Sequence, residues 1–324
     1  MKQLLLFVSL VFILAGCSTK EYYEPEDTLG NYQSTKDDLK AEIISMNKDG
    51  ATLENGEIIT KRGLSKFKLP EEYVFLNISD DKVIASNYKD KVLIDEKELE
   101  VGGVVVAATS KDNQLAMLFS DNSIQLYDLD EDRILLKEYF PHSFVNDTRI
   151  ANPYFMSNIV LFPTLDGKIV IVSQADNKMI KNIVVDAKGQ FNNIIFLDVI
   201  NDTLVAATAN KVITVGDGVL NIKDYNIRDI ITKDSYIYIA TIDGQIIKTD
   251  ISLNIMDRRK YRYAKVYALA YGSTLYALES QGFLIKISED FKSDEIYDFS
   301  FDNERKVIAL DDTIYYDDEY IILK

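Results

Sequence analysis

The side chains in this chain that could do chemistry are mainly carboxylates. The sequence holds a single histidine, His142, and a single cysteine, Cys17. These numbers exclude most histidine-based metal sites and nearly all Ser-His-Asp or Cys-His catalysis. His142 follows Pro141, and we expect it to be a loop residue. Catalysis, if present, would therefore have to depend on aspartate and glutamate.

Two acidic clusters offer oxygen ligands of the kind that Ca²⁺ prefers. Neither has EF-hand spacing with a central glycine and a terminal glutamate. Both coincide with expected hairpin turns, where aspartate is favoured for backbone reasons. We therefore predict no metal site at these clusters, which are Asp128, Asp130, Glu131 and Asp132, and Asp311, Asp312, Asp317, Asp318 and Glu319.

Other site signatures are weak or absent. The glycines form neither a G-x-G-x-x-G loop nor a phosphate loop, which removes support for nucleotide chemistry. Arg258–Tyr263 (RRKYRY) is a basic segment with interleaved aromatic rings, and we interpret it as a charged outer strand that blunts a sheet edge. Carboxylates from different repeats could still assemble a glycosidase site, which leaves no local signature. The sequence predicts no catalytic residue and no cofactor.

The N-terminus has the pattern of a lipoprotein signal peptide. Lys2 precedes an eleven-residue apolar run, Leu4–Leu14, which is too short to span a bilayer as a helix. The block Leu14-Ala15-Gly16-Cys17 closely matches the bacterial lipobox. We predict that residues 1–16 are removed and that the thiol of Cys17 is lipidated.

Composition then limits the partners of the exported chain. Lys and Arg total 36 against 52 Asp and Glu, so the formal charge is −16, which makes nucleic acid an unsuitable partner. The same balance argues against adhesion of the domain to anionic lipid, so any membrane attachment is expected through the lipid at Cys17. Residues 17–40 are polar and acidic, and we predict a flexible tether there.

A repeated pair of strands with a polar turn fills the rest of the chain. Aligned on the first apolar residue after the polar pair, seven repeats begin 32, 44, 45, 33, 38 and 39 residues apart. This spacing averages close to the ~40 residues of one four-stranded propeller blade. The repeats start at Val83, Leu115, Ile159, Leu204, Ile237, Leu275 and Ile314.

The repeat predicts an all-β fold, a single β-propeller over residues 41–324. Inner strands read as nearly continuous apolar runs, and Asp166-Gly167, Asp243-Gly244 and Gln281-Gly282 fall at one place in the repeat, where hairpins need positive φ. Each repeat leaves room for a strand before the pair, at Val104–Thr109, Ile194–Val199, Arg228–Thr232 and Val266–Ala270. Two β-sandwich domains remain an alternative fold.

The number of blades depends on the N-terminal stretch. The seventh repeat ends with about three strands, so we predict seven blades, with Ala41–Lys61 donating the missing outer strand. Alternatively, Ala41–Leu69 forms a blade of its own, with Gly50 and Gly56 at its turns, and the ring has eight blades.

A lipobox, an acidic tether and repeats of the form D-x-[IL]-Y-x-A-T-x-D-G-x-[IL] resemble the pyrroloquinoline-quinone-like propeller lipoproteins, in particular the BamB-type subunit of the outer-membrane β-barrel assembly machinery. The likeness covers most of residues 41–324. The chain departs from it in lacking any Trp, a residue that usually ends each quinoprotein repeat, and a cysteine pair. Quinone binding is therefore not expected.

The resemblance implies a noncatalytic scaffold that contacts a protein partner in the envelope, such as the β-barrel assembly complex, through loops at one end of the ring. Ser18 is not a retention residue, and by the same resemblance the protein would sit at the outer membrane, facing the periplasm. The alternative is a propeller enzyme or ligand-binding lipoprotein acting on envelope carbohydrate, whose site would need convergent carboxylates in the central channel.

Overall fold

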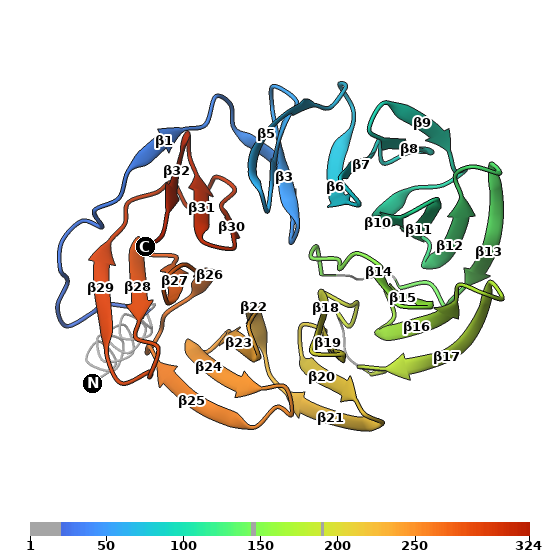
Figure 1. Ribbon diagram of the computed structural model, residues 1–324. Coiled ribbons are helices and arrows are strands. Elements are labelled where there is room, and N and C mark those ends of the chain that lie inside the picture. The colour runs from blue at the N-terminus through green and yellow to red at the C-terminus, as the bar shows by residue number, and fades with distance from the viewer. Residues whose placement is uncertain (1–20, 144–146, 189–190) are drawn as a thin grey trace, which may run out of the picture.

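The computed structural model describes residues 21–143, 147–188 and 191–324, and within these ranges every regular element is a β-strand. Eight four-stranded antiparallel sheets are arranged around a central axis as the blades of a propeller (Figure 1). In each blade the first strand lies nearest the axis and the fourth lies on the outer rim. The predicted all-β single propeller is confirmed.

The first four blades take up residues 43–184. Blade one contains β2 (Ile43–Asn47), β3 (Gly50–Leu53), β4 (Glu57–Thr60) and β5 (Gly63–Lys68). Blade two contains β6 (Val74–Ser79), β7 (Lys82–Ser86), β8 (Lys91–Ile94) and β9 (Lys97–Glu100). Blade three contains β10 (Val105–Lys111), β11 (Gln114–Phe119), β12 (Ser123–Asp128) and β13 (Arg133–Tyr139). Blade four contains β14 (Tyr154–Met156), β15 (Ile159–Pro163), β16 (Lys168–Ser173) and β17 (Lys178–Val184).

The other four blades complete the ring. Blade five contains β18 (Phe196–Ile200), β19 (Thr203–Ala207), β20 (Lys211–Gly216) and β21 (Val219–Asp224). Blade six contains β22 (Ile227–Lys233), β23 (Tyr236–Thr241), β24 (Gln245–Asp250) and β25 (Ile255–Lys260). Blade seven contains β26 (Val266–Tyr271), β27 (Leu275–Glu279), β28 (Phe283–Ile287) and β29 (Asp294–Asp298). Blade eight joins β30 (Ile308–Leu310), β31 (Thr313–Tyr316) and β32 (Glu319–Ile322) to β1 (Lys36–Asp38).

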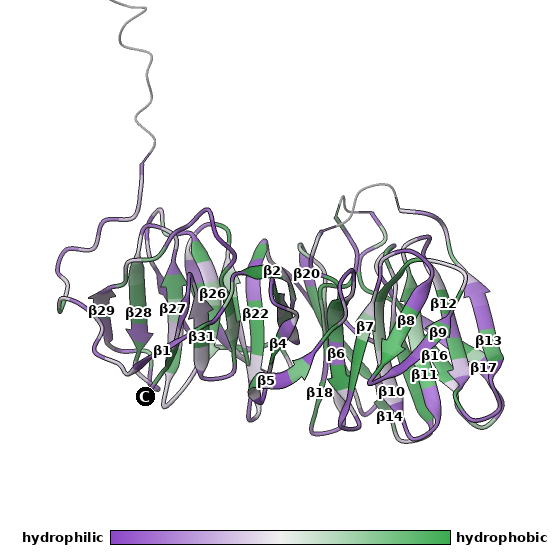
Figure 2. Ribbon diagram, turned by 90° about the horizontal axis from the view of Figure 1, so that it is seen from above, coloured by the Kyte–Doolittle hydropathy of each residue, from purple (hydrophilic) through white to green (hydrophobic). Residues whose placement is uncertain are grey.

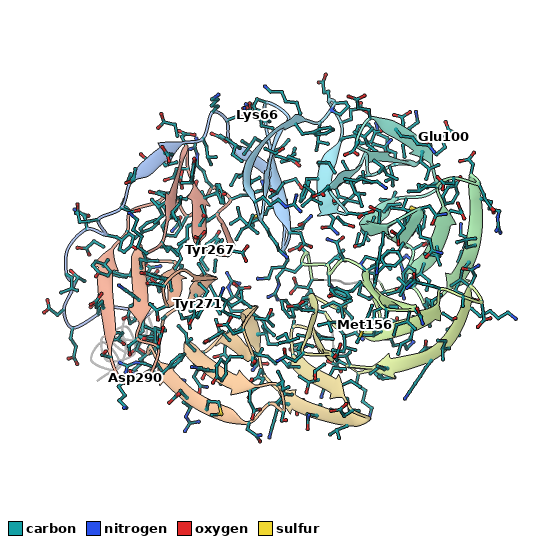
Figure 3. All side chains as sticks on the ribbon, in the orientation of Figure 1. Lys66, Glu100, Met156, Tyr267, Tyr271 and Asp290 are labelled. Atoms are coloured by element: carbon teal, nitrogen blue, oxygen red, sulfur yellow. The ribbon has the colours of Figure 1, made fainter. Side chains whose placement is uncertain are left out.

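Burial explains the apolar runs in the sequence. Every residue of the second strands β19 and β27 is buried, because these strands pack on both faces against neighbouring blades. On the outer strand β17, by contrast, six of the seven residues are exposed and one is half-buried. Side chains fill the spaces between blades (Figure 3), so the core is a ring of inter-blade clusters rather than one central mass.

The ring is closed by the N-terminal strand, as predicted, but at a different place. β1 pairs antiparallel with β32, with Lys36 opposite Ile321, whereas residues 43–68 form a complete blade of their own. The preferred number of seven blades is therefore wrong and the alternative of eight is correct. The donor strand has only three residues, all charged and exposed, so it carries no apolar signal in the sequence.

The segment that precedes β1 lies against the ring. We predicted a flexible tether up to Lys40, yet Tyr23 is buried, with its ring edge-on to those of Tyr261 and Phe283 at 6.1 and 5.7 Å. Farther along, the backbone amide of Leu29 donates to the carbonyl of Ile296 at 2.8 Å. We call residues 21–35 the strap. In Figure 1 it runs along the outside of β29 before it reaches β1.

The two faces of the ring differ in their turns. Figure 2 shows the ring from the side, with the C-terminus on the lower face. Turns from first to second and from third to fourth strands lie on that lower face, and the other connections lie on the upper face. Asp166-Gly167, Asp243-Gly244 and Gln281-Gly282 all occupy second-to-third-strand turns, as predicted. Gly244 has φ of +80°, and an added Cβ would lie 2.2 Å from the carbonyl oxygen of Tyr261, so only glycine fits.

Candidate functional site

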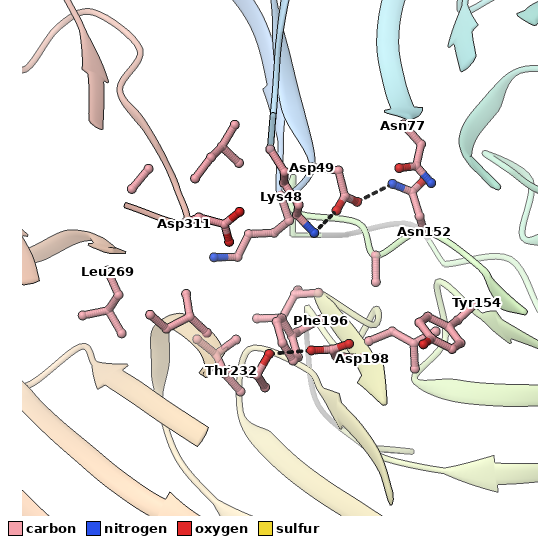
Figure 4. A pocket seen from close by; sticks show the side chains of 18 of the residues that line it. Lys48, Asp49, Asn77, Asn152, Tyr154, Phe196, Asp198, Thr232, Leu269 and Asp311 are labelled. Atoms are coloured by element: carbon pink, nitrogen blue, oxygen red, sulfur yellow. Dashed lines mark hydrogen bonds and ion pairs between the residues drawn. The ribbon is translucent and has the colours of Figure 1, made fainter. Parts of the chain in front are cut away.

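A cavity of about 350 Å³ lies on the propeller axis, where all eight blades contribute residues (Figure 4). The innermost strands deliver most of these residues near their lower-face ends, which explains why residues far apart in sequence converge. Its polar and charged lining side chains are Lys48, Asp49, Lys61, Asn77, Thr109, Asn152, Tyr154, Asp198, Thr232, Lys233, Tyr271 and Asp311.

The β2–β3 turn of blade one reaches into the axis and supplies its central carboxylate. Asp49 forms an ion pair with Lys61 at 2.6 Å and accepts a hydrogen bond from the side-chain amide of Asn152 at 2.6 Å. The same amide also donates to the carbonyl of Leu76, while its oxygen accepts from the backbone amide of Ala108. Asn152 therefore links blades one, two, three and four at the axis.

A second ion pair crosses the axis from blade one to blade six. Lys48 is paired with Asp229, whose side chain is only 8% exposed. The carboxylate of Asp229 also accepts the backbone amides of Ile230 at 2.9 Å and Leu269 at 2.7 Å. Removing one partner of such a buried pair typically costs about 3–5 kcal/mol, because the other charge is left without compensation. This pair therefore joins blades one and six across the axis.

The cavity holds Lys61 in its charged form. Burial alone would lower the pKa of the Lys61 ammonium, but Asp49, Asp311 and Asp198 together raise that pKa above its usual value. The side chain is 52% exposed to the channel, so solvent weakens these attractions. Burial, followed by the charge of Asp198, raises the pKa of Tyr154. The cavity wall thus presents ammonium groups, carboxylates and neutral polar groups together. Such a wall suits a polar ligand that carries both a positive and a negative charge.

Two of the three carboxylates of this wall, Asp49 and Asp198, are already engaged, and the third is Asp311. A glycosidase needs two carboxyl groups that face the scissile bond, one of which carries a proton. Here Asp49 is bound by Lys61 and Asn152, and Asp198 accepts the hydroxyl of Thr232. The arrangement can bind a small polar molecule through fixed hydrogen-bonding groups, and its volume lies near the lower limit of ligand pockets, which begins at about 300 Å³.

Comparison with known proteins gives two kinds of similarity, one in sequence and one in structure. No protein-family model matches the chain. Among curated proteins, the chain is similar to the plasminogen-binding protein PgbB of two Helicobacter pylori strains, 26695 and J99, at 27% and 26% identity. Each alignment covers 91% of this chain but only 64% of the relative. The chain thus spans just under two thirds of the length of the curated relatives it matches.

Solved structures match the propeller as a whole. BamB from Moraxella catarrhalis superposes with a TM-score of 0.67 at 12% identity, over 90% of this chain and 99% of that one. The C-terminal WD40 domain of Sif2 gives 0.63 at 10% identity, over 90% and 99%. The computationally designed Ika8 protein gives 0.60 at 14% identity, over 91% and 99%. At such low identity these matches show the fold alone, and they confirm its likeness to BamB.

The acidic clusters lie at or beside hairpin turns, and several of their carboxylates are bound by neighbouring groups. Asp128 accepts the backbone amides of Asp130 and Glu131 at 3.0 and 2.9 Å, and Tyr127 donates to Asp132 at 2.6 Å. In the second cluster, Arg305 binds Asp318 at 3.1 Å and Lys36 binds Glu319 at 2.6 Å. Among the residues that the structure describes, no group of three or more His, Cys, Asp or Glu side chains is placed to hold a metal ion.

The basic segment lies where the sequence predicts. Arg258–Lys260 ends the outer strand β25, and two of its cations are paired, Arg259 with Asp294 at 2.7 Å and Lys260 with Asp243 at 2.5 Å. His142 lies in the exposed loop after β13, as expected. Cys17 and the predicted signal peptide, residues 1–16, lie outside the described residues. No helix within the described ranges is long and apolar enough to cross a bilayer.

The axial residues were not singled out from the sequence. Their signal is positional, because five of them lie on first strands: Asn77, Thr109, Asp198, Thr232 and Tyr271. If the repeats are aligned on their first strands rather than on their second strands, these polar residues fall close to one another in the alignment. Asp49 and Lys61 have no such marker, because blade one is predicted only as an alternative and is not among the seven aligned repeats.

Proposed function

We propose that this protein is a noncatalytic, lipid-anchored scaffold that binds a protein partner in the cell envelope, within outer-membrane β-barrel assembly. The anchor is the lipid on Cys17, and the propeller faces the periplasm. No cofactor is required. The proposal draws on the lipobox, on the likeness of the fold to BamB and on the surface of the ring.

The observation that carries the proposal is an apolar outer surface on blades four to six. Eight large hydrophobic side chains there are at least 43% exposed, although an ordinary soluble surface scatters such residues singly. Exposed apolar side chains that are concentrated on neighbouring outer strands in this way support a contact with another macromolecule. The eight are Met179, Ile180 and Val184 of β17, Val219, Leu220 and Ile222 of β21, and Ile255 and Met256 of β25.

The test is affinity purification of the full-length protein from crosslinked envelopes, followed by mass spectrometry. We expect recovery of the barrel-assembly insertase, and lower levels of outer-membrane barrel proteins in cells that lack this protein. A Cys17→Ser variant, which cannot be lipidated, is the matched control for anchoring and should leave the membrane fraction. Unchanged barrel levels and no assembly partner would refute the assembly role. A preparation enriched in sugar polymer would favour the carbohydrate-binding alternative, with the axial cavity as its site.

Plasminogen is a second candidate partner, because the alignment with the plasminogen-binding relatives covers 91% of this chain. The measurement is direct binding of purified residues 21–324 to immobilised plasminogen, with serum albumin as the control surface. Saturable binding to plasminogen alone would support this candidate. Equal signals on both surfaces would remove it.

A further inference from the structure

The eight outer strands differ in how their free edges are protected against pairing with another chain. In β5, β13, β17 and β25 the register with the third strand shifts at a β-bulge, which twists the edge away. β9 and β1 are short and charged, with sequences KELE and KDD. β29 is regular, but the strap covers it. β21 has none of these protections.

β21 is a regular and apolar edge. It pairs with β20 in six consecutive positions without a shift, from Lys211 opposite Asp224 to Gly216 opposite Val219. The side chains of Val219, Leu220 and Ile222 are 56%, 49% and 47% exposed. Long, regular, apolar edges are the ones that accept an added strand.

The backbone of β21 also offers free hydrogen-bonding groups at known positions. The amide of Tyr225 donates to the carbonyl of Asn210 at 3.0 Å, which fixes the alternation of the antiparallel ladder. Alternate residues therefore point their N–H and C=O groups away from β20. These residues are Leu220, Ile222 and Asp224.

Blade seven shows how such an edge is filled. β29 also pairs without a register shift, and the strap lies alongside it in parallel. Leu29 donates to the carbonyl of Ile296, the amide of Asp298 donates to the carbonyl of Gly30 at 2.9 Å, and Tyr32 donates to Asp298. An extended segment therefore already adds to one outer strand of this propeller. Figure 1 places β21 two blades away from it, and no segment of the described residues lies alongside its outer edge.

Charge indicates what kind of segment fits β21. Five exposed cations lie on it and on the outer strands of its two neighbours, and within the described residues four of them form no ion pair, although the whole chain carries −16. The four unpaired cations are Lys178 and Lys181 of β17, Lys223 of β21 and Arg258 of β25. The exposed Asp224 on β21 is already bound by Lys211. An acidic segment would complement this surface.

We propose that β21 binds an extended, acidic segment of a partner protein, which adds to blade five as a fifth strand. Main-chain hydrogen bonds to Leu220, Ile222 and Asp224 supply the pairing, and alternate side chains of the segment meet the exposed Leu220 and Ile222. This inference rests on the proposed scaffold function and names the surface and the class of partner that it uses.

The test uses purified residues 21–324 and three labelled decapeptides, read out by fluorescence polarisation and amide hydrogen exchange. The first alternates Val and Glu, the second alternates Val and Lys, and the third is the Val-Glu peptide with proline in place of every valine. We expect binding of the first peptide at least tenfold tighter than of the other two. Exchange protection should appear at the amides of Leu220, Ile222 and Asp224.

Matched variants locate the binding. Leu220→Glu/Ile222→Glu should weaken the Val-Glu peptide at least tenfold, whereas Ile134→Glu/Tyr139→Glu on the bulged β13, where exposure is 50% and 67%, should change it less than twofold. Ile222→Pro removes the outward N–H together with the isoleucine side chain but no hydrogen bond to β20, so it should weaken binding while the melting temperature stays near that of the parent. Equal binding of all peptides, equal loss in both double variants, or no binding of the Val-Glu peptide would overturn the proposal.

The same variants separate this inference from the scaffold function. If Leu220→Glu/Ile222→Glu loses the peptide but still crosslinks to its envelope partner, the scaffold stands and its partner binds elsewhere. If the peptide binds at β21 but no envelope partner is recovered, the edge is real and the assembly role is wrong.

Discussion

Blades five and seven end in outer strands of the same kind that have opposite surroundings. β21 and β29 both pair without a shift, yet β29 is covered by the strap whereas β21 faces solvent. Their charges differ as well: β29 reads DEIYD, and the region around β21 carries unpaired cations. The comparison teaches that a regular outer edge in this propeller can be covered by an extended segment, which satisfies its free hydrogen-bonding groups. The uncovered edge of β21 is therefore a candidate binding site for such a segment.

The largest expected effect comes from removing the strap, because this makes blade seven resemble blade five. A chain that begins at Ala41 loses the buried side chains of Tyr23 and Leu39, the ring of Tyr32 and strand β1. At about 2 kcal/mol for each large side chain, the free energy of unfolding should fall by about 5 kcal/mol or more relative to a chain that begins at Glu21. Urea denaturation of both chains measures this difference.

The same truncation tests whether a regular, uncovered outer strand binds a peptide of opposite charge. The freed β29 is acidic, so it should bind the Val-Lys peptide, whereas the chain that begins at Glu21 should not. If the truncated chain is as stable as the longer one, neither the strap nor the closing strand β1 stabilises the ring in solution. If it binds neither peptide, a regular edge alone is not enough for strand addition.

Much of the fold could be predicted because seven blades carry their own signal. Buried second strands such as Tyr236–Thr241 are packed on both sides, so selection for packing leaves long apolar runs. The turn glycines mark the same position in several repeats. A separate blade one is only the alternative prediction, because its strands are short. The same residues could also supply the outer strand that closes a seven-blade ring. A three-residue charged strand such as β1 can be placed only by the geometry of closure.

The axial cavity could not be predicted in the same way. Asp49, Lys61 and Asn152 meet there because the ring brings blades one and four together, and no local spacing encodes that meeting. The acidic clusters, in contrast, were interpreted correctly as turns, because Asp128 bonds to backbone amides two and three residues away. Local interactions leave a mark in the sequence, whereas convergence across blades does not.

A smaller effect is expected at two turn glycines, one behind the strap and one beside the open edge. The carbonyl of Gly244 accepts the amide of Tyr261, whose ring packs on Tyr23, and Gly218 lies in the turn before β21 with no atom within 4 Å of an added Cβ. Positive φ costs alanine about 1–2 kcal/mol at both positions, and overpacking adds about 1–3 kcal/mol at Gly244 only. Gly244→Ala should therefore lower the melting temperature more than Gly218→Ala. Equal losses would show that the Tyr261 backbone moves away freely.

The smallest effect is the response of the strap to alkali. Burial first, and then the charges of Asp294 and Glu279, raise the pKa of Tyr23 to about 12, above its ordinary 10. A raised pKa means that folding favours the neutral phenol of Tyr23. Its contribution to the free energy of unfolding is therefore complete below pH 10 and is lost as pH rises from 10 to 12. Tyr23→Phe cannot ionise, and between these pH values it should lose about 1–3 kcal/mol less stability than the parent chain. Because β21 has no tyrosine, the parent chain and the Tyr23→Phe variant should bind the Val-Glu peptide equally between pH 10 and pH 12. Identical pH slopes for parent and variant would mean that the strap leaves blade seven before Tyr23 ionises.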